Sequence, residues 1–183
     1  MLAFQAGSEE AFTTLVRRHQ ARVYGVIHRF CGPAADVEDL SQEVFVRVFR
    51  TARRYRPSAK FSTWLYRIAV NVSLNALRSR RRQATVSLDA RIGETDRGGA
   101  QLAHPAAPSP DEAVGADELA RLIRRAVDAL GESQRMAVIL SHYEKMNYEQ
   151  IADVLDCSTM AVKSLLARGR ARLRQLLARQ LES

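Results

Sequence analysis

The sequence predicts an all-α protein made of two small helical domains. Apolar residues recur at helical spacing on both sides of residues 83–115, a stretch rich in Gly, Pro, Ala and acidic residues. No segment shows a convincing strand pattern. The chain has 183 residues and 46% hydrophobic content, enough for one medium domain or two small ones. We therefore predict a first domain over 1–82, a flexible linker over 83–115 and a second domain over 116–183.

Three apolar stripes at helical spacing occupy the first domain. They run from Phe12 to Phe30, from Val37 to Phe49 and from Trp64 to Leu77. Pro33 and Pro57 follow the first and second stripes, where a proline stops a helix. Ser62 or Thr63 can cap the third helix. The spacing leaves open whether the first stripe begins as two separate helices.

A helix-turn-helix is predicted at residues 147–172, after a further stripe from Leu119 to Leu130. Its two short helices each bury one stripe, formed by Ile151, Ala152 and Leu155 and by Val162, Leu165 and Leu166. Asn147 and Gln150 have the form of a capping box that opens the first helix.

The second helix of this motif has the features of a DNA-reading helix. Ser158 or Thr159 can cap it, and Asp156 can adopt a left-handed conformation in the turn. Its outward face carries polar and basic side chains, namely Lys163, Ser164, Arg168, Arg170 and Arg172. Such side chains reach phosphates and base edges in a major groove. The alternative is an αα-hairpin with a solvated basic face.

The charge of the chain favours a polyanionic partner. The net charge is +8, and residues 1–82 hold 15 Lys or Arg against 6 Asp or Glu. Nucleic acid is favoured over membrane because the basic segments accompany a helix-turn-helix. No apolar run approaches the roughly 18 residues that span a bilayer, and no signal peptide is present, so we expect a cytoplasmic protein without membrane insertion. Cys31 and Cys157 belong to no Cys/His cluster, so neither a disulfide framework, a metal site nor a cofactor is expected.

Three motifs in this order resemble the extracytoplasmic-function (ECF) sigma factors, bacterial transcription initiation factors that keep only the second and fourth sigma domains. They are DVEDLSQEVFVRVFR at 36–50, FSTWLYRIAVNVSLNALRSRRR at 61–82, and the terminal helix-turn-helix. The resemblance implies a sigma domain 2 that reads the minus-ten promoter element and a sigma domain 4 that reads the minus-thirty-five element. The implied partners are promoter DNA, core RNA polymerase through its β′ coiled coil and β subunit, and an anti-sigma factor inserted between the domains.

The candidate polymerase-binding residues share one helix. Asp39, Gln42 and Glu43 lie at i, i+3 and i+4, opposite the apolar stripe, in a patch that ends in Phe45 and Phe49. A solvated acidic face is the alternative interpretation. The resemblance implies that Asp39, Gln42 and Glu43 hold the β′ coiled coil.

The candidate DNA-binding residues fall into two groups. Asn71 and Asn75 lie one helical turn apart, and Asn has the donor and acceptor pair that reads a base edge, although two polar surface residues are the alternative. By resemblance, their helix and the loop before it bind the unwound minus-ten element through Phe61, Trp64, Arg67, Asn71, Asn75, Arg78, Arg80 and Arg81. Trp64 also fits the core stripe, and the Arg-rich end is expected to hold phosphates. The minus-thirty-five residues implied are Thr159, Lys163, Ser164, Arg168 and Arg170.

Two other functions fit the sequence less well. A metal-dependent nuclease would need a second element to face the carboxylates of residues 36–43, and none is evident, so we expect no enzyme. The remaining alternative is a helix-turn-helix regulator that binds an operator without sigma activity.

The linker averages on the order of 30 Å between its ends and extends to at most about 110 Å. It can bridge DNA elements about 34–70 Å apart, so the domains are expected to rotate independently.

Overall fold

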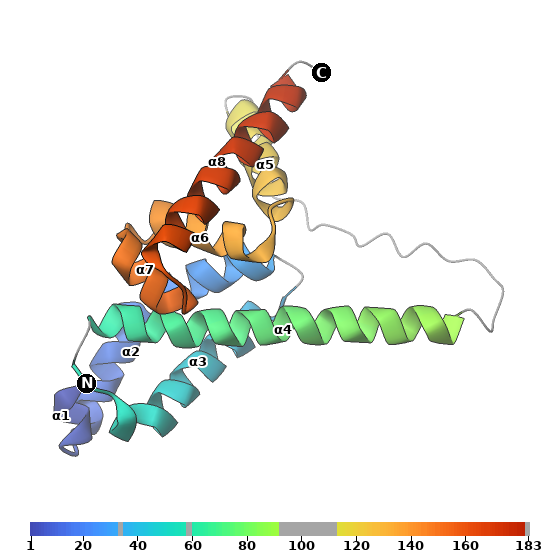
Figure 1. The fold of residues 1–183 in the computed structure, drawn as a ribbon. Helices are drawn as coiled ribbons and strands as arrows, with labels where there is room; N and C mark the ends of the chain where they lie inside the picture. Colours follow the sequence, from blue (N-terminus) through green and yellow to red (C-terminus); the bar gives the residue numbers. More distant parts are fainter. Residues whose placement is uncertain (33–34, 58–59, 92–112, 182–183) are drawn as a thin grey trace.

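The structure is a computed structural model that describes residues 1–32, 35–57, 60–91 and 113–181 (Figure 1). The described residues form helices without any strand, which confirms the all-α prediction. The elements are α1 (Leu2–Gln5), α2 (Glu9–Cys31), α3 (Val37–Thr51), the 3-10 turn η1 (Ala52–Arg54), α4 (Phe61–Arg91), α5 (Ala113–Asp128), α6 (Glu132–His142), α7 (Tyr148–Leu155) and α8 (Thr159–Leu181). None of the helices in these ranges is both long and apolar enough to cross a bilayer.

The first apolar stripe is preceded by a separate short helix. The Ser8 hydroxyl accepts a hydrogen bond from the Ala11 amide at 3.3 Å and opens α2, while α1 ends before Gly7. Gly32 ends α2 at a φ of 76°, a left-handed value that glycine adopts without strain. Pro33, which was predicted to stop this helix, lies outside the described residues.

The start of α4 differs from the prediction. Neither Ser62 nor Thr63 caps the helix, because the Lys60 carbonyl accepts from the amides of Thr63 at 2.9 Å and Trp64 at 3.4 Å. The helix therefore begins at Phe61, and both predicted caps lie inside its first turn.

The end of α4 also lies beyond the predicted domain boundary. The helix continues to Arg91 and α5 begins at Ala113, so both ends of the predicted linker are helical, while residues 92–112 lie outside the described residues. The predicted boundary at residue 82 lies where the apolar residues of α4 no longer recur at helical spacing. A helix continues without that period as long as nothing breaks it, and no Gly or Pro occurs between residues 61 and 91.

Each half of the chain buries part of its predicted stripes, while Phe49, Leu119 and Ile123 of those stripes are exposed. In the N-terminal helices (α1–α4) the largest fully buried side chains are Phe30, Ile27, Leu65, Val23, Val26, Val44 and Val48. In the C-terminal helices (α5–α8) they are Met136, Ile139, Leu140, Ile151 and Leu166. Gly169 lets α8 approach α6 closely, since a Cβ there would lie 3.2 Å from Val138 Cγ2.

The two halves pack against each other, contrary to the expectation that they rotate independently. Figure 1 shows α3 below α4 and α6 and α7 above it, while α2 passes behind α4 and its C-terminal end reaches α6; buried residues of both halves form one cluster. The Tyr66 hydroxyl on α4 donates to the Glu144 carboxylate. Arg81 pairs with Glu132 at 2.8 Å. The composition of residues 83–115 predicted a flexible linker and therefore independent domains, and it carries no information about contacts between α4 and the C-terminal helices.

Candidate functional site

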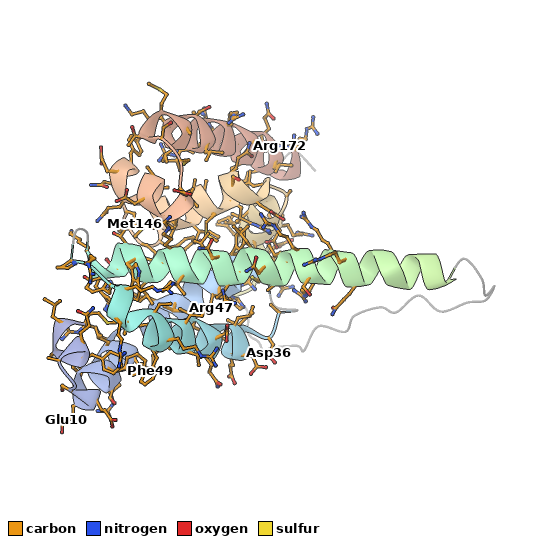
Figure 2. The ribbon with its side chains drawn as sticks, turned by 60° about the horizontal axis from the view of Figure 1, so that its bottom comes forward. Glu10, Asp36, Arg47, Phe49, Met146 and Arg172 are labelled. Carbon is orange, nitrogen blue, oxygen red and sulfur yellow. The ribbon has the colours of Figure 1, made fainter. Side chains whose placement is uncertain are left out.

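An apolar groove of about 480 Å³ lies between α2 and α3. Its lining residues are Phe12, Val16, Gln20, Ser41, Gln42, Phe45, Val46, Phe49 and Arg50. Three of the predicted polymerase-binding residues, Gln42, Phe45 and Phe49, meet here. Figure 2 shows Phe49 at one end of α3 and Asp36 at the other. The α2 side of the groove was not predicted as a site, because Phe12 and Val16 read as ordinary members of a helix stripe.

An aromatic cluster fixes one end of this groove. The Phe49 ring, 55% exposed as a residue, lies 5.3 Å from Phe12 and 5.2 Å from Phe4 between ring centroids. Gln5 Nε2 donates to the carbonyls of Ala52 at 2.7 Å and Tyr55 at 3.0 Å, which ties α1 to the end of α3. The short N-terminal helix thus holds one wall of the groove in place.

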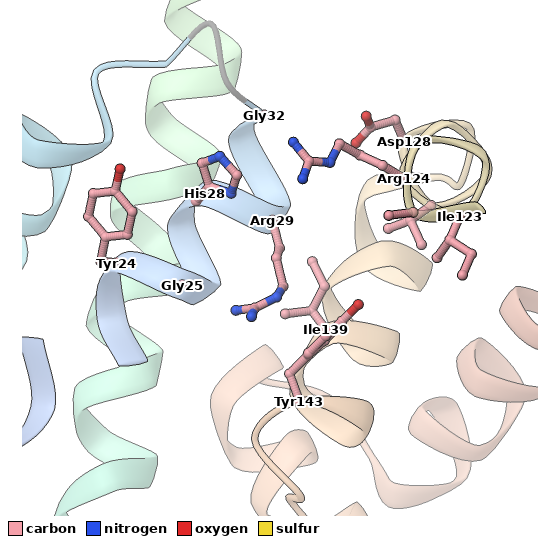
Figure 3. Close-up of a pocket in the computed structure, with 12 residues that line it drawn as sticks. Tyr24, Gly25, His28, Arg29, Gly32, Ile123, Arg124, Asp128, Ile139 and Tyr143 are labelled. Atoms are coloured by element: carbon pink, nitrogen blue, oxygen red, sulfur yellow. The ribbon is translucent and has the colours of Figure 1, made fainter. Parts of the chain in front are cut away.

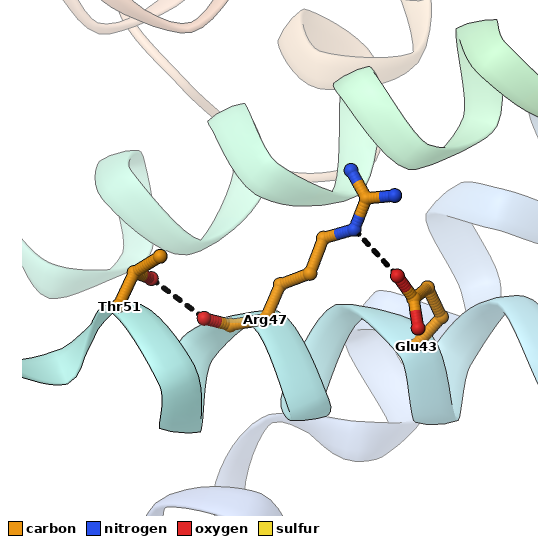
Figure 4. A network of polar contacts seen from close by, with 3 residues as sticks. All are labelled: Glu43, Arg47 and Thr51. Carbon is orange, nitrogen blue, oxygen red and sulfur yellow. Dashed lines mark hydrogen bonds and ion pairs between the residues drawn. The ribbon is translucent and has the colours of Figure 1, made fainter.

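The predicted acidic residues lie beside the groove and outside its lining. Asp39 is exposed in the first turn of α3, and its amide donates to the Asp36 side chain at 3.1 Å. Glu43 is half-buried and accepts a hydrogen bond from Arg47 Nε at 2.6 Å (Figure 4). Arg47 was missed as its partner, although their spacing of four residues was the available signal. The Arg47 ion pair fixes the orientation of the Glu43 carboxylate.

One exposed face of α4 carries the predicted base-reading residues. Arg67, Asn71 and Asn75 lie at successive helical turns and are all exposed, and exposed Arg78 and Arg81 follow them. The predicted Arg80, one residue earlier, is half-buried. The row places amide and guanidinium groups along one side of the helix, where Arg67 and Arg81 face carboxylates of the C-terminal half, Asp156 and Glu132.

Aromatic residues gather where α4 begins. The half-buried Trp64 ring lies 5.1 Å from Tyr55 and 5.8 Å from Phe61 between centroids, and it packs against the core cluster as its place in the stripe predicted. His19 meets Phe61 edge-on at 5.3 Å, and burial lowers the pKa of this histidine.

A pocket of about 460 Å³ separates this end of α4 from the helix-turn-helix. Its lining residues are Arg56, Thr63, Trp64, Arg67, Ala152, Asp153, Asp156 and Cys157. Arg67 Nη2 lies 3.6 Å from Asp156 Oδ1. The Thr63 hydroxyl is buried and has no hydrogen-bond partner within the described part of the chain. Arg56 was not named among the site residues, although the loop before α4 that contains it was expected to bind the minus-ten element.

The helix-turn-helix forms as predicted. The Asn147 side chain accepts from the Gln150 amide at 2.9 Å, and the Gln150 side chain accepts from the Asn147 amide at 3.1 Å, which completes the capping box. Asp156 ends α7 in a left-handed conformation at a φ of 53°. Ser158 caps α8 by accepting from the Ala161 amide at 3.1 Å, so Thr159 is the first residue of the helix.

The second helix of the motif, α8, presents the predicted polar and basic face. Thr159, Lys163, Ser164, Arg168, Arg170 and Arg172 are all exposed, whereas Val162 and Leu166 are buried beneath them. The Lys163 ammonium lies 5.9 Å from the Tyr148 ring, and Arg168 Nε donates to the Ser164 carbonyl at 3.3 Å. Figure 2 shows Arg172 on the side of the molecule away from α3.

A further cleft of about 450 Å³ opens between α2 and the C-terminal helices α5 and α6 (Figure 3). Arg29 and Arg124 contribute its positive charge, and the Arg29 guanidinium lies 4.2 Å from the centroid of the Tyr143 ring. Ile123 belongs to the stripe that was expected to be buried, yet it is exposed and lines the same cleft as Tyr143. Apolar and cationic groups therefore face the same opening.

The two cysteines are free. Cys31 is buried at the end of α2, and its thiol donates to the Ser73 carbonyl at 3.8 Å. Burial raises the pKa of the thiol at Cys31 and also at Cys157, where the Asp156 charge adds to the effect. Within the described ranges, no three His, Cys, Asp or Glu side chains are grouped so that they could hold a metal ion.

Comparisons with known proteins agree with this layout. The families described as Sigma-70 region 2 and Sigma-70, region 4 match residues 15–83 and 120–173. The chain is 35% identical over 167 residues to the ECF RNA polymerase sigma-E factor of Escherichia coli K12, covering 91% of this chain and 86% of that protein. It is 33% identical over 170 residues to the RNA polymerase sigma-H factor of Pseudomonas aeruginosa, with the same coverage of 91% and 86%.

Solved structures share the fold. CnrH, solved in complex with the cytosolic domain of CnrY, matches with a TM-score of 0.68 and 27% identity over 94% of this chain and 91% of CnrH. RpoE from Bartonella quintana, solved in complex with the anti-sigma factor NepR, has a TM-score of 0.66 over 92% of this chain and 98% of RpoE. Its identity of 21% supports similarity of fold alone.

Proposed function

This chain belongs to the extracytoplasmic-function group of RNA polymerase sigma factors, and from that premise we propose how its surfaces divide the work of transcription initiation. The observation that carries the proposal is that the predicted residues lie in separate groups on α3, α4 and α8, each with exposed side chains backed by buried apolar residues. The chain acts by binding and positioning in the cytoplasm, where the polymerase is, and no chemical step is assigned to it.

The groove between α2 and α3 binds core RNA polymerase. Phe45 and Phe49 offer apolar area at its wall, and Gln42 offers a hydrogen-bonding amide. Asp39 and Glu43 add negative charge along one edge, with Glu43 oriented by Arg47. An apolar groove with an acidic edge suits a helix of the β′ coiled coil, and we assign a further contact of the core enzyme to its β subunit.

The exposed face of α4 reads the minus-ten element as a single strand. Asn71 and Asn75 can read base edges, while Arg67, Arg78, Arg80 and Arg81 hold phosphates. Phe61 and Trp64 stand where a displaced base would stack, and stacking offsets the few kcal/mol that unstacking costs.

The outward face of α8 reads the minus-thirty-five element in the major groove. Thr159 stands at the helix N-terminus, where backbone amides attract a phosphate. Lys163, Ser164 and Arg168 lie along the next turns, and Arg170 reaches the flanking backbone.

An anti-sigma factor restrains the chain before initiation. The cleft of Figure 3 has exposed apolar and cationic side chains, which suits an amphipathic segment with acidic residues. CnrH, which is similar to this chain, was solved with the cytosolic domain of CnrY. Purification from the native cells under non-inducing conditions tests this partner. A stoichiometric inhibitor should copurify, and recovery of the chain only free or bound to core polymerase would contradict the proposal.

Run-off transcription tests the central proposal. The purified chain is added to core polymerase with fragmented genomic DNA, and transcripts should start at a defined set of promoters. An operator-binding regulator would bind fragments without core polymerase and start no transcript. That result would overturn the assignment of these surfaces.

A further inference from the structure

We propose that the helix-turn-helix closes over the minus-ten surface of the same chain and blocks it with the carboxylates of Asp153 and Asp156, which stand where DNA phosphates would bind. The inference rests on the proposed function of α4 for the identity of what is blocked. The closure itself rests on the contacts between α4 and the C-terminal helices.

The pocket between α4 and α7 brings opposite charges together. Arg56 and Arg67 line one side, and Asp153 and Asp156 line the other. Arg67 Nη2 lies 3.6 Å from Asp156 Oδ1, so a guanidinium assigned to a phosphate already faces a carboxylate of its own chain. A phosphate that approaches Arg67 from this side must displace that carboxylate or share the pocket with it.

The same pocket contains groups that a nucleotide could use and that Asp153 and Asp156 do not bind. The Thr63 hydroxyl is buried without a hydrogen-bond partner among the described residues, and the half-buried Trp64 ring lines the wall beside it. An unpaired hydroxyl, an aromatic ring and two guanidinium groups together suit a base with its phosphate. Asp153 and Asp156 therefore cover a surface whose polar groups are only partly satisfied.

Burial, more than charge, keeps the pocket closed. The side chains of the Arg67–Asp156 pair are 52% and 87% exposed, so water and salt weaken it and a phosphate can compete for Arg67. Tyr66, in contrast, is only 2% exposed, and its hydroxyl donates to Glu144 from the C-terminal half. Met146 and Ile151 are buried in the same cluster as the α4 core. Closure and blocking thus depend on different residues and can be tested separately.

The closed arrangement is incompatible with simultaneous reading of both promoter elements. The turn that precedes α8 lies against the start of α4, whereas the two elements are about 34–70 Å apart on the duplex. The halves must separate before both surfaces engage DNA. The affinity of the isolated chain for minus-ten DNA is then reduced in proportion to the fraction of open molecules.

Two variants and one control separate closure from blocking. Glu144→Ala leaves the Tyr66 hydroxyl buried without its acceptor in the closed form only, which favours the open form. Asp156→Asn removes the blocking charge and preserves the turn, because Asn also adopts the left-handed conformation. Glu149→Gln is the matched control, since it removes the same charge from α7 at an exposed position outside the pocket.

Two measurements on the full chain report the outcome. Trp64 is the only tryptophan of the chain and lines the pocket, so acrylamide quenching of its fluorescence without DNA measures opening. Fluorescence anisotropy with a labelled oligo(dT) strand measures phosphate binding. Glu144→Ala should increase quenching and tighten oligo(dT) binding at least about fivefold. Asp156→Asn should tighten binding by up to about fivefold at low salt, and Glu149→Gln should change neither quantity appreciably.

Each negative result would overturn a different part of the proposal. Wild-type quenching in a folded Glu144→Ala variant would overturn the closure, because α7 would then not shield Trp64 in solution. Equal oligo(dT) affinities for Asp156→Asn and Glu149→Gln would overturn the blocking role of the carboxylate. Increased quenching in Glu144→Ala without oligo(dT) binding by any variant would uphold the closure and contradict the proposed minus-ten role of α4.

Discussion

Replacing Gln42 and Glu43 together by alanine should weaken binding to core polymerase while the fold persists. Gln42 is exposed at the groove, and Glu43 is half-buried beside it in its ion pair with Arg47. The buried residues of α3 near them are Val44 and Val48, which the change leaves intact. Truncation of these two side chains therefore opens no cavity in the core.

The expected magnitudes separate folding from docking. The Glu43–Arg47 pair has 41% exposed side chains at both partners and spans four residues of one helix, so its loss costs about 0.3–0.5 kcal/mol. In a chain of this size 1 kcal/mol shifts the melting temperature by about 2–4 °C, so the shift should stay below about 2 °C. Loss of the Gln42 amide in the groove together with the Glu43 charge at its edge should weaken binding at least about tenfold, or about 1.4 kcal/mol.

Interferometry with immobilised core polymerase, paired with thermal melts followed by circular dichroism, measures both quantities. Glu149→Ala serves as the control, because it removes one carboxylate from α7, far from the groove in sequence and outside its lining. Unchanged core affinity in the folded double variant would refute the docking role. A melting temperature lowered by more than about 5 °C would refute the claim that these side chains contribute little to the fold.

Three further predictions address DNA reading, the helix cap and pH. Asn71→Ala and Asn75→Ala should relax minus-ten preference by about 1–3 kcal/mol per lost base contact. Lys163→Ala and Arg168→Ala should instead relax the preference for the minus-thirty-five element. Transcription from promoters altered at one element or the other measures both effects, and Asn variants that respond only to changes in the minus-thirty-five element would contradict the assignment. Asn147→Ala removes the side-chain acceptor of the capping box and should cost about 1 kcal/mol in urea unfolding, whereas Asn147→Asp should retain most of the stability. Burial, with the charges of Arg22 and Arg18, holds the pKa of His19 below its usual 6.5, so the folded state binds fewer protons. The contribution of neutral His19 to the free energy of unfolding is present above about pH 6.5 and is lost as the pH falls through the lowered pKa. If the free energy of unfolding of His19→Gln depends on pH in the same way as that of the wild type, this prediction is wrong.

Much of the helix-turn-helix was predictable from its local sequence, whereas the local prediction that Ser62 or Thr63 caps α4 was wrong. The capping box of Asn147 and Gln150, the left-handed Asp156 and the buried Val162 and Leu166 all follow from residues a few positions apart. The end of α4 was misplaced because the apolar period ends before the helix does.

The packing of α4 against the C-terminal helices was missed, although α4 does carry a signal. Tyr66 and Val70 lie one turn apart, outside the predicted stripe, and both are only 2% exposed. A helix with apolar residues on more than one face is buried from more than one side. Which helices cover this second face could not be predicted from the sequence. The proximity of Asp156 to Arg67 could not be predicted either, because both depend on how distant segments pack in the tertiary structure.

Asp156, the left-handed residue of the turn, can be replaced in evolution without loss of the turn. Only Asp, Asn and Gly fit a φ of 53° readily, and a single base change in the codon converts Asp into either of the others. Mutation at this one codon can therefore remove a charge that faces Arg67 while the turn of the DNA-reading motif keeps its shape. Selection can thus tune how strongly the turn competes with a phosphate for Arg67 without having to redesign the surface of α8 that meets the promoter.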